Sequence, residues 1–206
     1  MAENLKNKNM CTFSNESKDK LGNSIIYIAN YVKKLSKTKL LKLLYLMEEE
    51  MVTRYHTPFL GLPFEVWQAG PVLKDVFIDL SGRLFLLKDY IQVYNEGNCT
   101  YIDSIAQFCD DEFSDCEIKM MDSILRKYGL YSAKDLVKIT HKENGLWYKT
   151  AKENDLLESF EKKECNNSDI RIDFTQLLSN SEAMDYQDSL AIHQTANILK
   201  RNVSGR

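Results

Sequence analysis

The sequence predicts a mainly α protein, with a compact helical domain, a small β-hairpin and a short C-terminal extension. One observation is a stripe of apolar residues at helical spacing over residues 40–55. A second is a pair of helix-start signals at 113–118 and 131–136, where a serine is followed three residues later by an acidic residue. A third is the alternation of apolar and polar residues at 90–94 and 99–102 around a glycine-containing loop, which is typical of a β-hairpin.

The stripe within residues 40–55 predicts the most secure helix of the chain. Ser36 precedes it as a candidate N-cap, because a serine oxygen there can accept a hydrogen bond from the first turn. The apolar face consists of Leu40, Leu44, Met47, Met51 and Tyr55. The polar positions on the rest of the wheel, which we expect to be exposed, are Lys42, Glu49, Glu50 and Arg54.

Further helices are expected from their caps. Pro71 suits the first position of a helix that continues to about Ser81, because a missing N–H costs nothing there. The helices begun at 113–118 and 131–136 are expected to end at Gly129 and before Gly145. Trp147 opens another predicted helix, which runs through Phe160.

Composition divides the chain into three parts. Residues 1–22 are rich in Asn, Lys and Ser, which predicts a flexible N-terminal arm. Residues 23–160 form the predicted helical domain. Residues 161–206 begin with a polar linker and form a C-terminal extension, with a short strand at 170–174 and an amphipathic helix that uses Met184, Ala191, Ile198 and Leu199.

Charge and cysteine content narrow the class of protein. The net charge is −3 and the pI is about 5.7, which disfavours a nucleic-acid binder because neutralising phosphates requires a concentrated basic face. No apolar run reaches the ~18 residues of a membrane span, and no signal peptide is visible, so we expect a cytoplasmic protein. The five cysteines are scattered without a CxxC pair, which predicts free thiols and no zinc site.

Motifs for catalysis are sparse. The sequence has no GxSxG, P-loop, GxGxxG or HExxH motif, and its only histidines are His56, His141 and His193. One hypothesis brings His56, His141 and Glu48 together as a metal or acid–base site. The alternative is that His141 forms local hydrogen bonds near a helix end, and the residues favour this alternative.

All three prolines of the chain lie within residues 56–72, together with Gly61 and Gly70, which predicts a rigid, shaped loop. Trp67 lies in this loop, and the other tryptophan, Trp147, follows Gly145. These indoles either fill the core where helices meet the loop or anchor a partner. The basic run 33–42 is interpreted as a solvated helix start, with phosphate contact as the alternative.

Two segments carry recognisable motifs. The first segment, 41–77, contains LKLLYLMEE and PFLGLPFEVWQAGPVLKDVF. The second segment, 124–147, reads ILRKYGLYSAKDLVKITHKENGLW. Together they resemble the Panacea domain of SocA-like antitoxins. The first segment is similar to the KLLYF-type helix and the G-x-x-F-x-A-x-x-x-GPV pattern of that family, and the second to its YG–S–x–x–x–L pattern that ends in TH and PW. We call these the first and second signature segments.

Matching by position assigns family-motif residues, which are candidates for partner binding. They are Lys42, Leu43, Leu44, Tyr45, Gly61, Phe64, Gly70, Pro71, Val72, Leu136, Thr140, His141 and Trp147, and Trp67 is added as an aromatic anchor. Two positions depart from the pattern: Leu146 stands where proline is usual, and Val66 where a small residue is usual.

The resemblance implies an antitoxin that neutralises a cognate protein toxin by direct binding. It implies a toxin gene beside the antitoxin gene, a setting that includes phage-associated proteins, and no cofactor. The extension 161–206 is expected to help select the partner. Two alternatives remain open, namely an adaptor or transcriptional regulator of a mobile element and an enzyme that uses His141 with His56 or Glu48. A homodimer is also possible.

Overall fold

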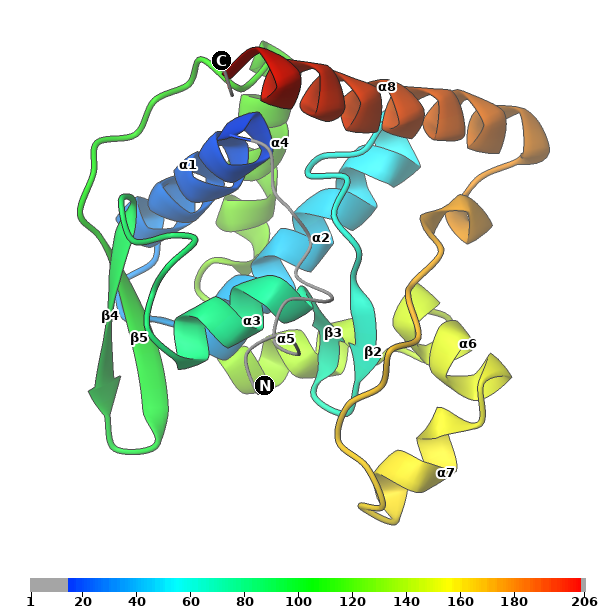
Figure 1. Cartoon of the computed structure of the whole chain (residues 1–206). Coiled ribbons are helices and arrows are strands. Elements are labelled where there is room, and N and C mark those ends of the chain that lie inside the picture. The colour runs from blue at the N-terminus through cyan, green and yellow to red at the C-terminus, as the bar shows by residue number, and fades with distance from the viewer. Residues whose placement is uncertain (1–14, 205–206) are drawn as a thin grey trace, which may run out of the picture.

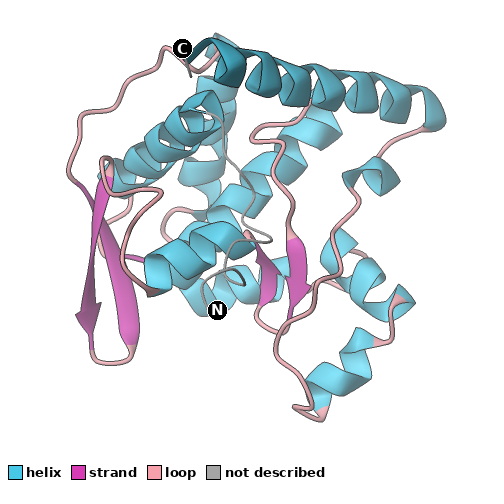
Figure 2. Cartoon of the chain, viewed as in Figure 1, coloured by secondary structure: helices cyan, strands magenta, loops and turns pink. Residues whose placement is uncertain are grey.

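A computed structural model describes residues 15–204, and side chains within residues 17–193. The predicted mainly α class is confirmed, because helices make up most of the fold and the strands form only two small antiparallel sheets, one of which lies at an edge of the molecule (Figures 1 and 2). The helices are α1 (Asn15–Tyr31), α2 (Lys37–Tyr55), α3 (Lys74–Ser81), α4 (Asp115–Tyr128), α5 (Ala133–Thr140), α6 (Leu146–Glu153), α7 (Leu156–Glu161), the 3₁₀-helix η1 (Phe174–Leu177) and α8 (Asn180–Ser204). The strands are β1 (Leu35–Ser36), β2 (Glu65–Trp67), β3 (Gly70–Val72), β4 (Ile91–Glu96) and β5 (Cys99–Ser104).

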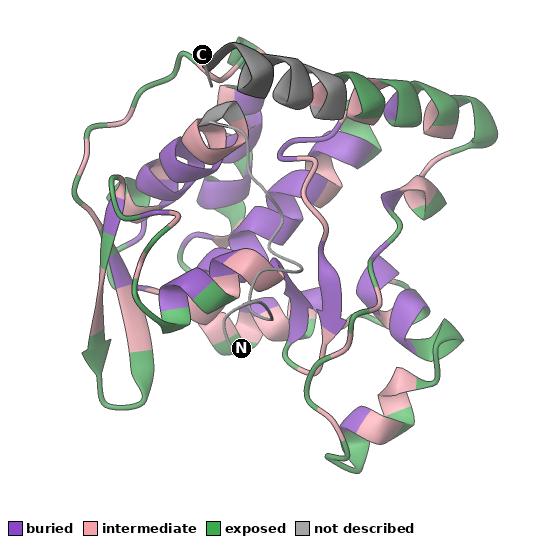
Figure 3. Ribbon diagram, viewed as in Figure 1, coloured by how far each residue is buried: buried purple, intermediate pink, exposed green. Residues whose placement is uncertain are grey.

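Helix α2 is the centre of the fold. It contacts α3, α4, α5, η1 and strands of both sheets, so it is covered on most sides (Figure 3). Ser36 caps its N-terminus, as predicted, by accepting a hydrogen bond from the Lys39 N–H. Lys42 and Glu48 are nevertheless only 1% exposed, so the prediction of a solvent-facing Lys42 is wrong. The helix wheel assumed one buried face, whereas neighbours cover α2 nearly all round.

The local predictions from caps and alternation are confirmed. Ser114 and Glu117 form a capping box on α4, Ser132 caps α5, and α4 ends at Gly129. Strands β4 and β5 form the predicted hairpin, to which β1 adds a third strand in the order β1-β5-β4.

Two predicted elements in the middle of the chain differ. Pro71 does not begin a helix: it lies in β3, paired with Val66 of β2, and the helix begins at Lys74. Proline fits there because the strand pairs on one side only. The predicted helix from Trp147 to Phe160 is split into α6 and α7 at Asp155, which adopts a left-handed φ of 56°.

The predicted N-terminal arm overlaps α1, so its boundary at residue 22 is wrong. Residues 15–22 are helical, Leu21 is fully buried, and the Lys20 ammonium lies 2.5 Å from the Glu117 carboxylate of α4. The polar composition concealed this segment because Leu21 is the only large apolar residue within residues 15–22. Residues 1–14 lie outside the described residues.

The C-terminal extension lies against the helical domain. The predicted strand at 170–174 does not form a continuous ladder. Its pairing with β2 is an isolated bridge between Arg171 and Glu65. In α8, Tyr186 is buried, whereas Met184 is 67% exposed, so the predicted core role of Met184 is wrong. Ala191 is also exposed, and the side chains of Ile198 and Leu199 lie outside the described ones.

Two predictions from the sequence concern membrane spans and cysteine pairing. Within residues 15–204, no helix combines the length and the apolar character that crossing a bilayer requires. The described cysteines, Cys99, Cys109, Cys116 and Cys165, are free thiols, as predicted.

Replacing Leu21 by alanine tests the placement of α1. We expect the free energy of unfolding to fall by about 2–5 kcal/mol, because the substitution leaves a cavity in the core. Leu130→Ala is the control, since that leucine is 93% exposed, and it should change stability by less than about 0.5 kcal/mol. Denaturant unfolding measures both, and equally small effects would contradict the placement.

Candidate functional site

The two signature segments meet at the short hairpin formed by β2 and β3. Strand pairs join Glu65 to Val72 and Trp67 to Gly70, with a turn at Gln68 and Ala69. Helix α2 of the first signature segment contacts β3, α5 of the second contacts β3, and α6 contacts β2. We call residues 65–72 the clamped hairpin.

Lys42 holds the clamped hairpin from α2. Its ammonium group donates a hydrogen bond of 2.8 Å to the Pro71 carbonyl oxygen. Among the described residues it forms no ion pair with a carboxylate, and burial lowers the pKa of Lys42 to about 7. A buried lysine is costly unless hydrogen-bonded, so this contact depends on the close approach of β3.

Gly70 allows that close approach. It has a φ of +96°, and a Cβ atom there would lie 2.8 Å from Lys42 Cε and 2.9 Å from Thr140 Oγ1. The Thr140 hydroxyl donates to the Val137 carbonyl oxygen at 3.0 Å. Side chains from α2 and α5 therefore both lie against Gly70, at a position where only glycine fits.

His141 and Trp147 hold the turn of the hairpin. The two ring nitrogens of His141 face the carbonyl oxygens of Val137 and Gln68, at 2.5 and 3.0 Å. Trp147 lies against the imidazole with ring centroids 3.8 Å apart, and its indole N–H donates to the Trp67 carbonyl oxygen at 3.1 Å. Burial lowers the pKa of His141, the two carbonyl groups oppose this shift, and Lys42 adds to it.

The opposite side of the hairpin is held by side chains within and beside it. The Trp67 indole N–H donates to the Glu65 carboxylate at 3.0 Å, and its ring meets Phe77 edge-to-face at 4.9 Å. The Gln68 side-chain amide donates to the Phe160 carbonyl oxygen at 2.6 Å. The sequence motifs do not single out Glu65 and Gln68. Their positions within two residues of Trp67, in the rigid loop, are the signal that could identify them.

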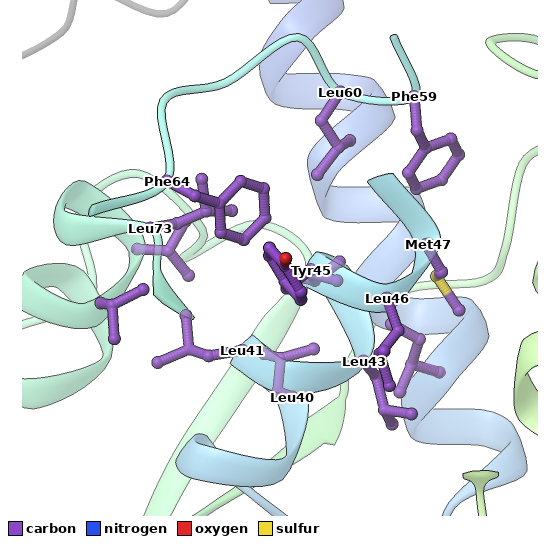
Figure 4. Packing of buried hydrophobic residues seen from close by; sticks show 14 of the residues in the cluster. Leu40, Leu41, Leu43, Tyr45, Leu46, Met47, Phe59, Leu60, Phe64 and Leu73 are labelled. Atoms are coloured by element: carbon purple, nitrogen blue, oxygen red, sulfur yellow. The ribbon is translucent and has the colours of Figure 1, made fainter. Parts of the chain in front are cut away.

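The proline-containing loop that precedes β2 is anchored by Glu48 and Tyr45. The Glu48 carboxylate accepts hydrogen bonds from the N–H groups of Phe59, Leu60 and Gly61, at 3.1, 2.8 and 3.4 Å. Tyr45 stands between α2 and this loop, with its ring edge-to-face with Phe64 at 5.5 Å (Figure 4). Burial raises the pKa of Glu48 to about 7, while the three backbone N–H groups oppose the shift.

The structure thus brings most of the sequence-predicted site residues together, and it buries them. The residues that lie in or against the hairpin are Lys42, Trp67, Gly70, Pro71, Val72, Thr140, His141 and Trp147. Those in or against the preceding loop are Tyr45, Gly61 and Phe64. Only Gly61, Trp67 and His141 of this set keep partial exposure. Direct partner binding stays a prediction for these three.

The hypothetical site of His56, His141 and Glu48 has no support in the contacts. His56 faces Glu182 of α8 at 3.4 Å, Glu48 is occupied by the loop amides, and His141 faces two carbonyl oxygens. Across the described residues, no group of three His, Cys, Asp or Glu side chains could hold a metal ion. The side chains that hold the clamped hairpin are suited to fixing the shape of its backbone, since they bind its carbonyl oxygens.

The chain belongs to the family of SocA-like antitoxins with a Panacea domain. The family description "Antitoxin SocA-like, Panacea domain" matches residues 40–148, more than half of the chain. The matched region contains both signature segments and the clamped hairpin, and it ends just after Trp147. No curated protein and no solved structure matches the chain.

Replacing Gly70 by alanine tests the close approach at the hairpin. Gly97→Ala is the matched control, because Gly97 also has a positive φ, +60°, but no atom lies within 4 Å of its added Cβ. Both variants should lose about 1–2 kcal/mol from backbone strain. Gly70→Ala should lose a further ~1–3 kcal/mol from overpacking against Lys42 and Thr140. Equal losses in denaturant unfolding would contradict the described contact.

The buried lysine predicts a pH dependence of stability. Lys42 has a pKa of about 7 in the folded protein, against about 10.4 in an unfolded chain. Between these values the unfolded chain binds more protons, so the free energy of unfolding rises with pH, by up to about 1.4 kcal/mol per pH unit.

We expect this rise in wild-type protein between about pH 7.5 and 9.5, below the ordinary pKa of tyrosine. The Lys42→Met variant, whose unbranched side chain is one atom shorter and carries no charge, should lack it. Denaturant unfolding at several pH values measures both proteins, and parallel pH profiles would show that Lys42 is not the cause.

Proposed function

We propose that this protein is the antitoxin of a toxin–antitoxin pair and neutralises a protein toxin by binding it directly. The family assignment supports an antitoxin. A single observation carries the binding mechanism. The family-motif side chains Lys42, Thr140 and Trp147 all fix the clamped hairpin from inside the protein.

A rigid scaffold favours binding because little conformational freedom is lost when a partner docks. An interface of ordinary size buries about 800 Å² on each partner, which the outer faces of the helices can supply. In this proposal the buried family-motif residues hold the shape, and exposed side chains outside them contact the toxin. The toxin is encoded by an adjacent gene, the pair acts in the cytoplasm, and a mobile element of phage origin is a plausible carrier.

Binding, rather than catalysis, is the proposed mode of action, since the candidate acid–base residues are each engaged in separate contacts. A DNA-binding regulator is the second candidate carried from the sequence, and the net charge of −3 weighs against it. A gel shift with the promoter region of its own gene separates the two, because electrostatic DNA binding weakens steeply as salt is raised.

Separate induction of this gene and its neighbour tests the proposal. The neighbour alone should arrest growth, and co-expression of this protein should restore growth and yield a complex that co-purifies. The Gly97→Ala variant, which changes an open turn, should rescue as the wild type does. A neighbour that is toxic but neither bound nor neutralised would contradict the proposal.

A further inference from the structure

Three large apolar or aromatic side chains stand exposed where α1 ends and α4 turns into α5. Leu130 is 93% exposed, and Tyr31 and Tyr131 are 46% and 45% exposed. We call Tyr31, Leu130 and Tyr131 the corner patch. Leu130 is almost wholly in water, so it is not part of the core. A single exposed leucine needs no explanation, but here two partly exposed tyrosines accompany it.

The corner patch is one continuous surface. Gly129 lies so close to Tyr31 that a Cβ atom on it would be 2.9 Å from Tyr31 Cε1. The rings of Tyr128 and Tyr131 meet at right angles, with centroids 5.8 Å apart. Tyr31 of α1 and the segment 128–131 therefore touch, although they are about a hundred residues apart in sequence.

The patch is also rigidly held. The Gly129 N–H donates to the Leu125 carbonyl oxygen at 2.7 Å, and Ser132 caps α5 immediately after the patch. From the first signature segment's helix, Lys39 donates to the Gly129 carbonyl oxygen at 2.7 Å. Leu130 and Tyr131 occupy the two positions that the second signature leaves unspecified between Tyr-Gly and Ser. The backbone of the corner is therefore fixed, and Leu130 and Tyr131 are presented from it.

Positive charge lies beside the patch. Lys127 lies 4.9 Å from the ring centroid of Tyr128, and among the described residues it forms no ion pair. The Glu50 carboxylate of α2, which faces Arg54, also interacts with Lys127.

Lys127 also lines a hollow on the surface of α4, together with Lys119, Asp122, Ser123 and Arg126. The one carboxylate of that hollow, on Asp122, already accepts from the Tyr27 hydroxyl at 2.7 Å and faces Arg126 at 3.6 Å. The net charge of the lining is therefore positive, and carboxylates of a partner would be attracted to it.

We propose that the corner patch and the adjacent hollow bind an acidic segment of the toxin, with an apolar side chain of that segment on Leu130 and Tyr131 and its carboxylates at Lys127 and the hollow. This inference rests on the proposed antitoxin function and assigns the surface that performs it. Tyrosine and arginine, which this surface provides at Tyr31, Tyr131 and Arg126, are enriched among binding hot spots. A nucleic acid would use the lysines but not the aliphatic Leu130, so the acidic protein segment fits the whole surface better.

The test compares two matched double variants in the co-expression and co-purification assays. The patch variant is Leu130→Asp with Lys127→Glu, and the control is Phe85→Asp with Lys88→Glu, at another exposed apolar side chain beside a lysine. The patch variant should bind the toxin at least about tenfold more weakly and lose neutralisation, whereas the control keeps both. Circular dichroism and thermal unfolding establish that both variants fold, as expected for exposed positions.

The outcomes separate this inference from the proposed function. If the wild-type protein neither binds nor neutralises the neighbouring gene product, the proposed function fails. If the wild type neutralises and the patch variant does so equally well, or if the control loses as much as the patch variant, the corner patch is not the toxin surface. Loss of binding after nuclease treatment, or a homodimer that Leu130→Asp dissociates, would identify a nucleic acid or a second copy as the occupant and overturn the proposal.

Discussion

The hydrogen bond from the Lys42 ammonium group to the Pro71 carbonyl oxygen joins the central helix to the β2–β3 hairpin. Its formation needs a helix covered on most sides, a strand that approaches within hydrogen-bond reach, and glycine at position 70. Burying a lysine costs free energy, as the depressed pKa shows. The hydrogen bond to the Pro71 carbonyl oxygen offsets part of that cost, and His141 and Trp147 help hold the hairpin that supplies this oxygen.

This constraint separates the chain into parts with different roles. Side chains of the two signature segments that point inward set the path of the hairpin and of the corner between α4 and α5. A side chain that points outward from the same segments, such as Leu130, is almost wholly exposed and contributes little to holding the fold. A scaffold held by the first set can therefore carry different outward-facing side chains without a change of fold.

Much of the local structure follows from the sequence because its causes are local. The caps at Ser36, Ser114 and Ser132 and the β4–β5 hairpin depend on neighbouring residues, and each was predictable. The errors arise where tertiary contacts decide. Lys42 is buried because distant segments cover α2, and Pro71 is a strand residue because β2 pairs with it. The signature segments indicate which residues gather at the clamped hairpin, but they do not indicate that most of these residues are buried.

Hydrogen exchange of the clamped hairpin tests the central claim, that the signature residues hold this hairpin as part of the core. The amides of Trp67 and Val72, which are paired with Gly70 and Glu65 across the hairpin, should exchange only with a free energy close to that of α2, which reports global unfolding. Exchange of these amides through a local opening several kcal/mol below that of α2 would show that the hairpin is not clamped, and would contradict the account.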